Sequence, residues 1–267
     1  MAVNINDLAI TSLETIQAYT LVTGDYMWTL DELQSATISQ TEEKVDFTGK
    51  QGRKLTSMKR NKAVTVSGPN GMISFGLLAT QAGSTFEATE GTMVQWYDHL
   101  TVTSNKATTN YKAFGTAGAE IQELWLKNNS VLDTKLAQDT TAASGKFAYD
   151  PSTKELTFSG ITDGTEIFVV YQRKVTGAYM ENMSDKYASK CQLYIDAIGE
   201  DKCGNQYHVQ FYIPKADFNG EFSFEMGDSQ SVHAFEAEAL ASGTGCGATA
   251  HGGVFWTCTV FGEDADV

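Results

Sequence analysis

The chain has 267 residues, of which 42% are hydrophobic, so it is long and apolar enough to bury a substantial core. No run approaches the roughly 18 apolar residues of a membrane span, and the N-terminus lacks the basic and apolar regions of a signal peptide. We therefore expect a soluble protein made in the cytoplasm, with no membrane partner. A formal charge of −14, from 33 acidic and 19 basic residues, disfavours a nucleic-acid reader because such a surface repels phosphates.

The first 30 residues predict a β-hairpin. Residues 15–21 and 25–30 have strand composition, and Thr23 and Gly24 form the turn between them. A polar stretch at residues 39–62 comes next and contains only scattered apolar residues, so it cannot build a core by itself. We expect a long exposed loop there.

Strand character resumes at residues 63–67, before a turn signal at residues 68–71. Near residues 72–80 the apolar side chains fall at i, i+4 and i+5, which favours a short helix. From residue 92 onward the pattern is β again, with a turn at residues 150–154. The strands are expected at residues 93–96, 100–103, 121–126, 156–158 and 167–171.

Residues 176–190 carry tyrosine and methionine at roughly helical spacing, and the pattern is compatible with either a second helix or a loop. The last third of the chain alternates with period two, which predicts half-buried antiparallel strands. Its inward-facing residues are expected to be Leu193, Ile195 and Ala197, then Val209, Phe211 and Ile213, then Phe222, Phe224 and Met226, then Phe235, Ala237 and Ala239. Because the sequence has no fixed-period repeat, we expect one all-β domain over residues 1–267.

Motifs that carry chemistry are missing from the sequence. Two disulfides among Cys191, Cys203, Cys246 and Cys258 are arithmetically possible, but a reducing cytoplasm favours free thiols. With His251 these cysteines lack the CxxC spacing of structural zinc sites, so we expect no metal. The sequence has no P-loop and no nucleophile elbow, and its four histidines form no recognisable triad. We therefore expect no cofactor and no catalysed reaction.

A basic cluster distinguishes residues 50–62 from this acidic chain. Six of the 19 basic residues lie within these 13 positions. One interpretation is a solvated, charged loop. The other is contact with a second copy, because a basic loop is complementary to an acidic body of the same protein. The candidate interface residues are Asp46, Phe47, Lys50, Arg53, Lys54, Leu55, Met58, Lys59, Arg60 and Lys62.

Two parts of the sequence resemble the tail tube proteins, or major tail proteins, of long-tailed bacteriophages. The N-terminal part, similar to an opening hairpin and long loop, comprises residues 16–33, 37–39 and 46–55. The C-terminal part, similar to the closing strands of the tube barrel, comprises residues 202–216, 222–224 and 233–240. The resemblance implies an antiparallel β-sandwich or barrel with one short flanking helix and long assembly loops.

The same resemblance implies a structural virion protein. In that family, rings that are usually hexameric stack into a tube, and genomic DNA passes through the lumen without specific binding. Residues 39–62 would then be the inter-ring loop, and the partners would be further copies and other tail proteins. The protein would be made in the host bacterial cytoplasm and reside in the virion tail. Residues 104–165 have no counterpart and are a possible insertion.

Two alternatives share the composition of this chain. A capsid or head-decoration protein is also acidic, rich in β-structure and symmetric in its contacts. A carbohydrate-binding or hydrolytic β-sandwich is suggested by Trp28, Trp96, Trp125 and Trp256, although core packing and interface contacts use tryptophan equally well.

Overall fold

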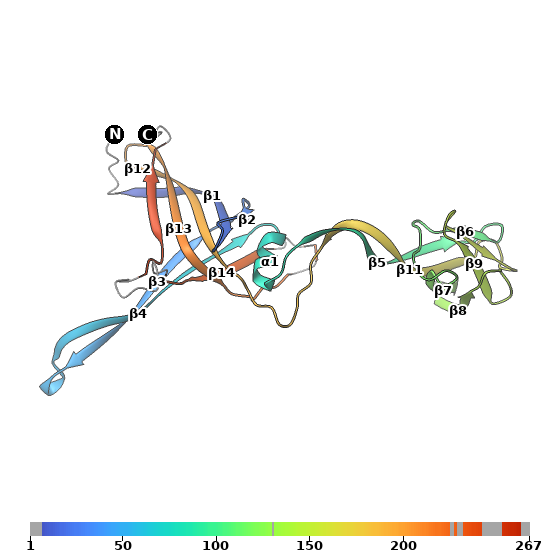
Figure 1. Ribbon diagram of the computed structural model, residues 1–267, viewed down its shortest axis with the longest axis horizontal. Helices are drawn as coiled ribbons and strands as arrows, with labels where there is room; N and C mark the ends of the chain where they lie inside the picture. The colour runs from blue at the N-terminus through green and yellow to red at the C-terminus, as the bar shows by residue number, and fades with distance from the viewer. Residues whose placement is uncertain (1–6, 130, 225–226, 229–231, 242–252, 263–267) are drawn as a thin grey trace. The chain divides into compact units, whose positions relative to one another are not determined.

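The fold is described from a computed structural model that covers residues 7–129, 131–224, 227–228, 232–241 and 253–262. Over these ranges the chain is all-β, with a single α-helix and two sheets, as the sequence predicts. It divides into two compact units (Figure 1). The first contains Met1–Phe86 and Met180–Val267, and the second is Glu87–Tyr179.

The first unit is built on one antiparallel sheet. Its strands follow the order β2-β1-β12-β13-β14-β4-β3, and β15 pairs with the free part of β13. Within the described residues, β2 and β3 are the outermost strands of this order and each has one unpaired edge, as has β15. The elements are β1 (Leu8–Thr20), β2 (Tyr26–Leu30), β3 (Thr37–Thr48), β4 (Lys54–Asn70), α1 (Phe75–Ala82), β12 (Lys190–Asp201), β13 (Gln206–Phe218), β14 (His233–Ala239) and β15 (Thr257–Phe261).

The core of this unit follows from alternation along the strands and from α1. Leu193 and Ile195 are two positions apart on β12, so both side chains face the core and belong to the same buried cluster as Leu77 of α1. Full burial of a leucine stabilises a fold by about 2 kcal/mol. The helix begins where the Ser74 side chain accepts a hydrogen bond from the Leu77 amide, and it ends at Gly83, whose φ of 64° is left-handed.

The second unit has its own sheet, with strand order β5-β11-β7-β8-β9-β10-β6. All its pairs are antiparallel except the short parallel contact of β8 with β9. Leu124, Phe147 and Tyr171 lie at the centre of its core. The strands are β5 (Glu87–Thr101), β6 (Lys106–Thr108), β7 (Ile121–Asn128), β8 (Val131–Gln138), β9 (Lys146–Asp150), β10 (Glu155–Phe158) and β11 (Glu166–Tyr179).

Several sequence predictions are confirmed by these elements. The N-terminal hairpin is β1 and β2, and the predicted helix is α1. The turn at residues 150–154 joins β9 to β10. Alternation is confirmed in β12, in β14 and, with Phe211 only half-buried, in β13.

Other predictions need correction. Residues 39–62 are not an irregular loop, because β3 and β4 pair almost to the turn at Gly49. The strands expected at residues 93–96 and 100–103 are one strand, β5. Beyond Tyr179 the chain up to residue 189 forms no second helix. Phe222 and Phe224 lie in an irregular segment rather than a strand, and Met226 falls outside the described residues.

The two compact units bear on the domain organisation, for which the sequence analysis expects one domain over residues 1–267. The possible insertion at residues 104–165 lies inside the second compact unit, which begins earlier, at Glu87, and ends later, at Tyr179. The long pairing of β5 with β11, from Glu166↔Thr101 to Tyr179↔Glu87, brings the two ends of this unit together. A segment whose ends are paired in this way can carry its own core, as the buried cluster around Leu124 shows.

Candidate assembly surfaces

The β3–β4 hairpin extends beyond the sheet that holds its base (Figure 1). Strand β14 supports β4 only between Val64 and Asn70, so residues 41–62 form a two-stranded ribbon, here called the arm. No residue of the arm is buried. An isolated two-stranded hairpin is only marginally stable in water. The arm therefore depends on its own cross-strand contacts, and it has both faces free for another molecule.

The tip of the arm is a short turn rather than a flexible tail. Lys50–Gly52 form one 3-10 turn, in which Gln51 and Gly52 have φ of 65° and 74°. The Gly49 amide donates to the Arg53 carbonyl at 2.7 Å, which closes the hairpin. The side chain of Leu55 folds over Gly49, where a Cβ would lie 2.9 Å from a Leu55 methyl group.

One face of the arm is apolar. Val45 lies opposite Met58 in the register, and Phe47 follows two positions later on the same face. Phe47 and Met58 are each 47% exposed, and Leu55 at the tip is 61% exposed. These exposed large side chains make the arm a candidate contact surface.

Ion pairs within the arm occupy half of the predicted basic cluster. Lys54 lies 2.6 Å from Asp46, and Lys59 pairs with Glu42. The Arg60 guanidinium contacts both carboxylate oxygens of Glu43, at 2.7 and 3.1 Å.

The other basic side chains divide between the two ends of the arm. At the base, the Lys62 ammonium lies 5.6 Å from the centroid of the Phe255 ring. At the tip, Lys50 and Arg53 form no ion pair with any residue that the structure describes. With seven basic and three acidic side chains, the arm carries a net charge of +4 on a chain of −14. All ten predicted interface residues lie on the arm. Of its basic side chains without an ion pair to a described residue, Lys50 and Arg53 are at the tip, Lys44 is in the middle of β3 and Lys62 is at the base.

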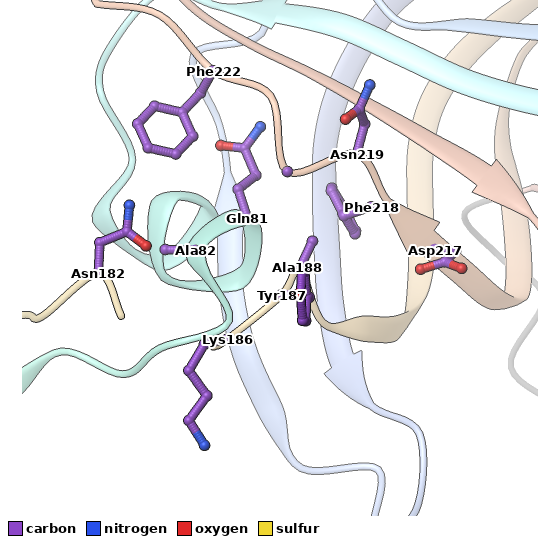
Figure 2. Close-up of a pocket in the computed structure, with 11 residues that line it drawn as sticks. Gln81, Ala82, Asn182, Lys186, Tyr187, Ala188, Asp217, Phe218, Asn219 and Phe222 are labelled. Atoms are coloured by element: carbon purple, nitrogen blue, oxygen red, sulfur yellow. The ribbon is translucent and has the colours of Figure 1, made fainter. Parts of the chain in front are cut away.

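A groove lies in the body of the first unit, around the connection from β13 to β14. It consists of two hollows that share Asn219. The first, of about 390 Å³, lies between the end of α1 and the segment that carries Tyr187 (Figure 2). The second, of about 370 Å³, lies at the base of the arm, beside Thr37 and Ser67, and its acidic residues are Glu221 and Glu236. We call the two hollows together the Asn219 groove.

Buried polar residues hold the wall of this groove in place. Nε2 of His233 lies 2.8 Å from Oε1 of Gln81, and Nδ1 of His233 accepts a hydrogen bond from the Ser74 amide at 3.3 Å. Because Nδ1 accepts, the proton of the neutral ring is on Nε2 and is donated to Gln81. Burial lowers the pKa of His233, which favours this neutral form. Sequence reasoning missed the pair, because no local pattern links residues 152 positions apart.

A third surface is the face of the sheet opposite the core. Tyr19, Tyr194 and Tyr212 follow one another across β1, β12 and β13, with ring centroids 5.4 and 4.5 Å apart. In the next row Asp196 contacts Thr15 at 3.2 Å and Gln210 at 2.7 Å. Strand β15 extends these rows with Thr257 and Thr259. The two rows thus present hydroxyl, amide and carboxylate groups and no basic side chain.

The tryptophans lie in different environments. Trp28 is buried and donates to Thr80 on α1 at 2.7 Å. In the second unit the Arg173 guanidinium lies between the rings of Trp96 and Tyr111, at 4.2 and 3.7 Å from their centroids. Trp125 is half-buried beside Lys135, and Trp256 is partly exposed next to Phe211. Core packing and cation–π contact thus account for Trp28 and Trp96.

The cysteines are free thiols wherever the structure describes them, at Cys191, Cys203 and Cys258. Burial raises the pKa of Cys191 to about 12. Cys246 and His251 lie outside the described residues. Within the described part of the chain, no three His, Cys, Asp or Glu side chains gather as metal ligands, and no helix is long and apolar enough to cross a membrane.

The all-β fold, the open sheet edges and the projecting arm are features expected of a structural protein. The chain belongs to the YomU/Tube protein family, whose family model matches residues 8–250. This is a phage tube-like family, so the protein is a structural component of the phage particle. No curated protein sequence matches the chain.

Proposed function

We propose that this protein assembles with itself into rings, and that the rings stack into the tail tube through which a bacteriophage delivers its genome. The family supports a tube protein, and the arm carries the proposal for assembly. A two-stranded ribbon of 22 residues without a buried side chain gains little within its own subunit. Its exposed Phe47, Leu55 and Met58 become buried only when another molecule covers them.

The open edges of the sheet support closure into a ring. Strands β2 and β3 end this strand order on either side, and on its outer edge neither pairs with another strand that the structure describes. Such edges pair readily with strands of another chain. A ring in which neighbouring sheets meet at these edges closes both ends of the strand order, and the number of subunits that the resemblance implies is six.

The tyrosine-lined face is our candidate for the wall of the lumen. Tyr194 and Asp196 lie at its centre, in two rows that offer no cation to a DNA phosphate. Electrostatic attraction to phosphate is the main source of nonspecific DNA affinity, so a neutral to acidic wall lets DNA slide. The genome would pass this face without specific binding.

In this proposal the protein catalyses no reaction and needs no cofactor. Its partners are further copies and the other proteins of the tail. It is synthesised in the cytoplasm of the host bacterium and reaches its working state only in the assembled virion. The net charge of −14 keeps free subunits apart until specific contacts form.

Electron microscopy of the purified protein, combined with sedimentation, tests the proposal. We expect rings or tubes to appear as the protein concentration rises, with a central channel in end views. A variant that lacks residues 41–62, joined by a two-residue turn, keeps the sheet but should give no stacked rings. If the full chain sediments only as a monomer at high concentration, the proposal is wrong.

A further inference from the structure

We infer that the tip of the arm docks into the Asn219 groove of a second copy of the chain. The inference rests on the proposed assembly and names the surface that receives the arm. The second hollow complements the arm in charge, because its carboxylates Glu221 and Glu236 form no ion pair with a described residue. The first hollow, which shares Asn219 with it, contains the cation Lys186 and the exposed rings of Tyr187 and Phe222.

The charges of the groove are available to a partner. Glu221 and Glu236 both line the second hollow, and neither forms an ion pair with a described residue. Asp217, which lines the first hollow, is already held by Lys190 at 3.2 Å. The free carboxylates are thus those nearest the base of the arm, while the cations at its tip, Lys50 and Arg53, form no ion pair with a described residue and lie at its far end.

The apolar parts match as well. Within the groove, Phe222 is 37% exposed and Tyr187 is 82% exposed, although both lie beside the buried end of α1 (Figure 2). The arm brings Leu55 and Phe47 next to its cationic tip. A contact that buries these side chains at its centre and joins two cations to two carboxylates at its rim has the usual anatomy of a protein interface.

The arm cannot reach its own groove. Thr37 and Ser67 line the groove and also face each other at the base of the arm. Eleven residues of β3 separate this base from Thr48, next to the tip, which corresponds to roughly 35 Å at the rise of a β-strand. Strands β3 and β4 pair along this length, interrupted only by register shifts between Thr41 and Glu43 and between Phe47 and Thr48. This pairing keeps the tip away from its own groove, so the tip meets the groove of another copy.

The contact between the arm tip of one copy and the groove of another allows assembly to continue beyond two subunits. The two surfaces are different, so each subunit keeps one free arm and one free groove after the contact forms. Such heterologous contacts propagate from copy to copy and do not end at a dimer. This is the contact that rings need in order to stack, with successive rings displaced by no more than the length of the arm.

Charge reversal tests the pairing. We expect Lys50→Glu with Arg53→Glu, and separately Glu221→Lys with Glu236→Lys, to raise the protein concentration needed for tubes about tenfold or more, because like charges then meet. The melting temperature should stay unchanged, since all four side chains lie outside the core. Glu87→Lys with Glu90→Lys is the matched control, with the same change of charge in the second unit and tubes at the wild-type concentration.

Rescue makes the test specific. A mixture of the two defective variants should form tubes again, because each reversed arm can meet a reversed groove and each native arm a native groove. The chain with all four substitutions should also recover. If the wild type forms tubes but neither the mixture nor the fourfold variant recovers, the arm does not dock into the Asn219 groove. The same conclusion follows if the Glu87 and Glu90 control loses assembly equally. In both cases the proposal of tube assembly is unaffected. A wild-type protein that forms no tubes would overturn both.

Discussion

Arg60 and Glu43 form a two-point contact across the arm, Nη2 to Oε1 at 2.7 Å and Nε to Oε2 at 3.1 Å. Asn61 donates a third hydrogen bond to the same carboxylate at 2.7 Å. A β-bulge between Thr41 and Glu43, with Asn61 in a left-handed conformation, turns these side chains toward each other. A basic residue that the sequence offers to another copy is therefore satisfied within its own arm.

Acid should loosen the arm while the core remains folded. The hydrogen bond from Arg60, and then that from Asn61, lowers the pKa of Glu43 below its ordinary value of 4.5. Because the folded pKa is the lower one, the contact is fully formed above the ordinary value and is lost as the pH falls through the folded value. NMR of backbone amides during an acid titration should show residues 42–61 shifting first. Glu43→Gln should show the loosened arm at neutral pH; an unchanged arm in that variant contradicts the prediction.

Gly83 is expected to be the least replaceable glycine of the first unit. It ends α1 with φ of 64°, and a Cβ there would lie 2.0 Å from the Tyr187 carbonyl oxygen. Gly83→Ala should lower the free energy of unfolding by about 2 kcal/mol or more, measured in urea. Gly24→Ala is the control, because Gly24 has φ of 72° but no atom within 4 Å of its Cβ position. Its cost should be about 1 kcal/mol, the left-handed strain alone. Equal losses in the two variants would contradict the clash.

The sequence predicts those parts of the fold that depend on neighbouring residues along the chain. Alternation in β12 and β14 fixed which side chains face the core, since a one-residue shift would expose all of them. The arm was missed because its strands bury nothing, and a low count of apolar residues suggested a loop. The signal was present in Val45 and Phe47, which alternate with charged neighbours before the glycines of the tip.

For the arm and the Asn219 groove, the sequence predicts the residues on a segment but not the contacts that depend on tertiary structure. All ten candidate interface residues were placed on one segment, and the structure places them on one arm. The pairing of Arg60 with Glu43 was out of reach, because it depends on the register and on a bulge. The Asn219 groove combines α1, residues 182–188 and the β13–β14 connection, and only tertiary packing brings these segments together.

His233 should make the stability of the first unit depend on pH. Burial lowers its pKa in the folded chain below the ordinary value of 6.5. Below pH 6.5 the unfolded chain therefore binds more protons than the folded chain, and the free energy of unfolding falls as the pH falls. Protonation would also place a hydrogen on Nδ1, where the Ser74 amide now donates.

Urea unfolding above and below pH 6.5 measures this effect. We expect His233→Leu to be less stable than the wild type at high pH, because Gln81 loses its partner, and to lose less stability on acidification. The difference between the two proteins isolates His233 from the carboxylates that titrate in both. Parallel curves for wild type and variant would show that His233 does not titrate in this range.

The proposed lumen wall predicts that native tubes bind DNA weakly and that added cations on this face increase binding. Gln210 lies on this face, 2.7 Å from Asp196, and Thr259 lies opposite Gln210 on β15. Gln210→Lys with Thr259→Lys would place two cations per subunit in rows of the wall that have none. Tubes of this variant should therefore retain double-stranded DNA at low salt and release it as salt rises. Co-sedimentation of tubes with DNA long enough to enter the channel measures retention.

The control is Gln122→Lys with Thr134→Lys, on exposed positions of the second unit, which gives the same charge change elsewhere and should bind less DNA. Equal retention by the two variants would place the lumen on another face, because charge alone would then explain the binding.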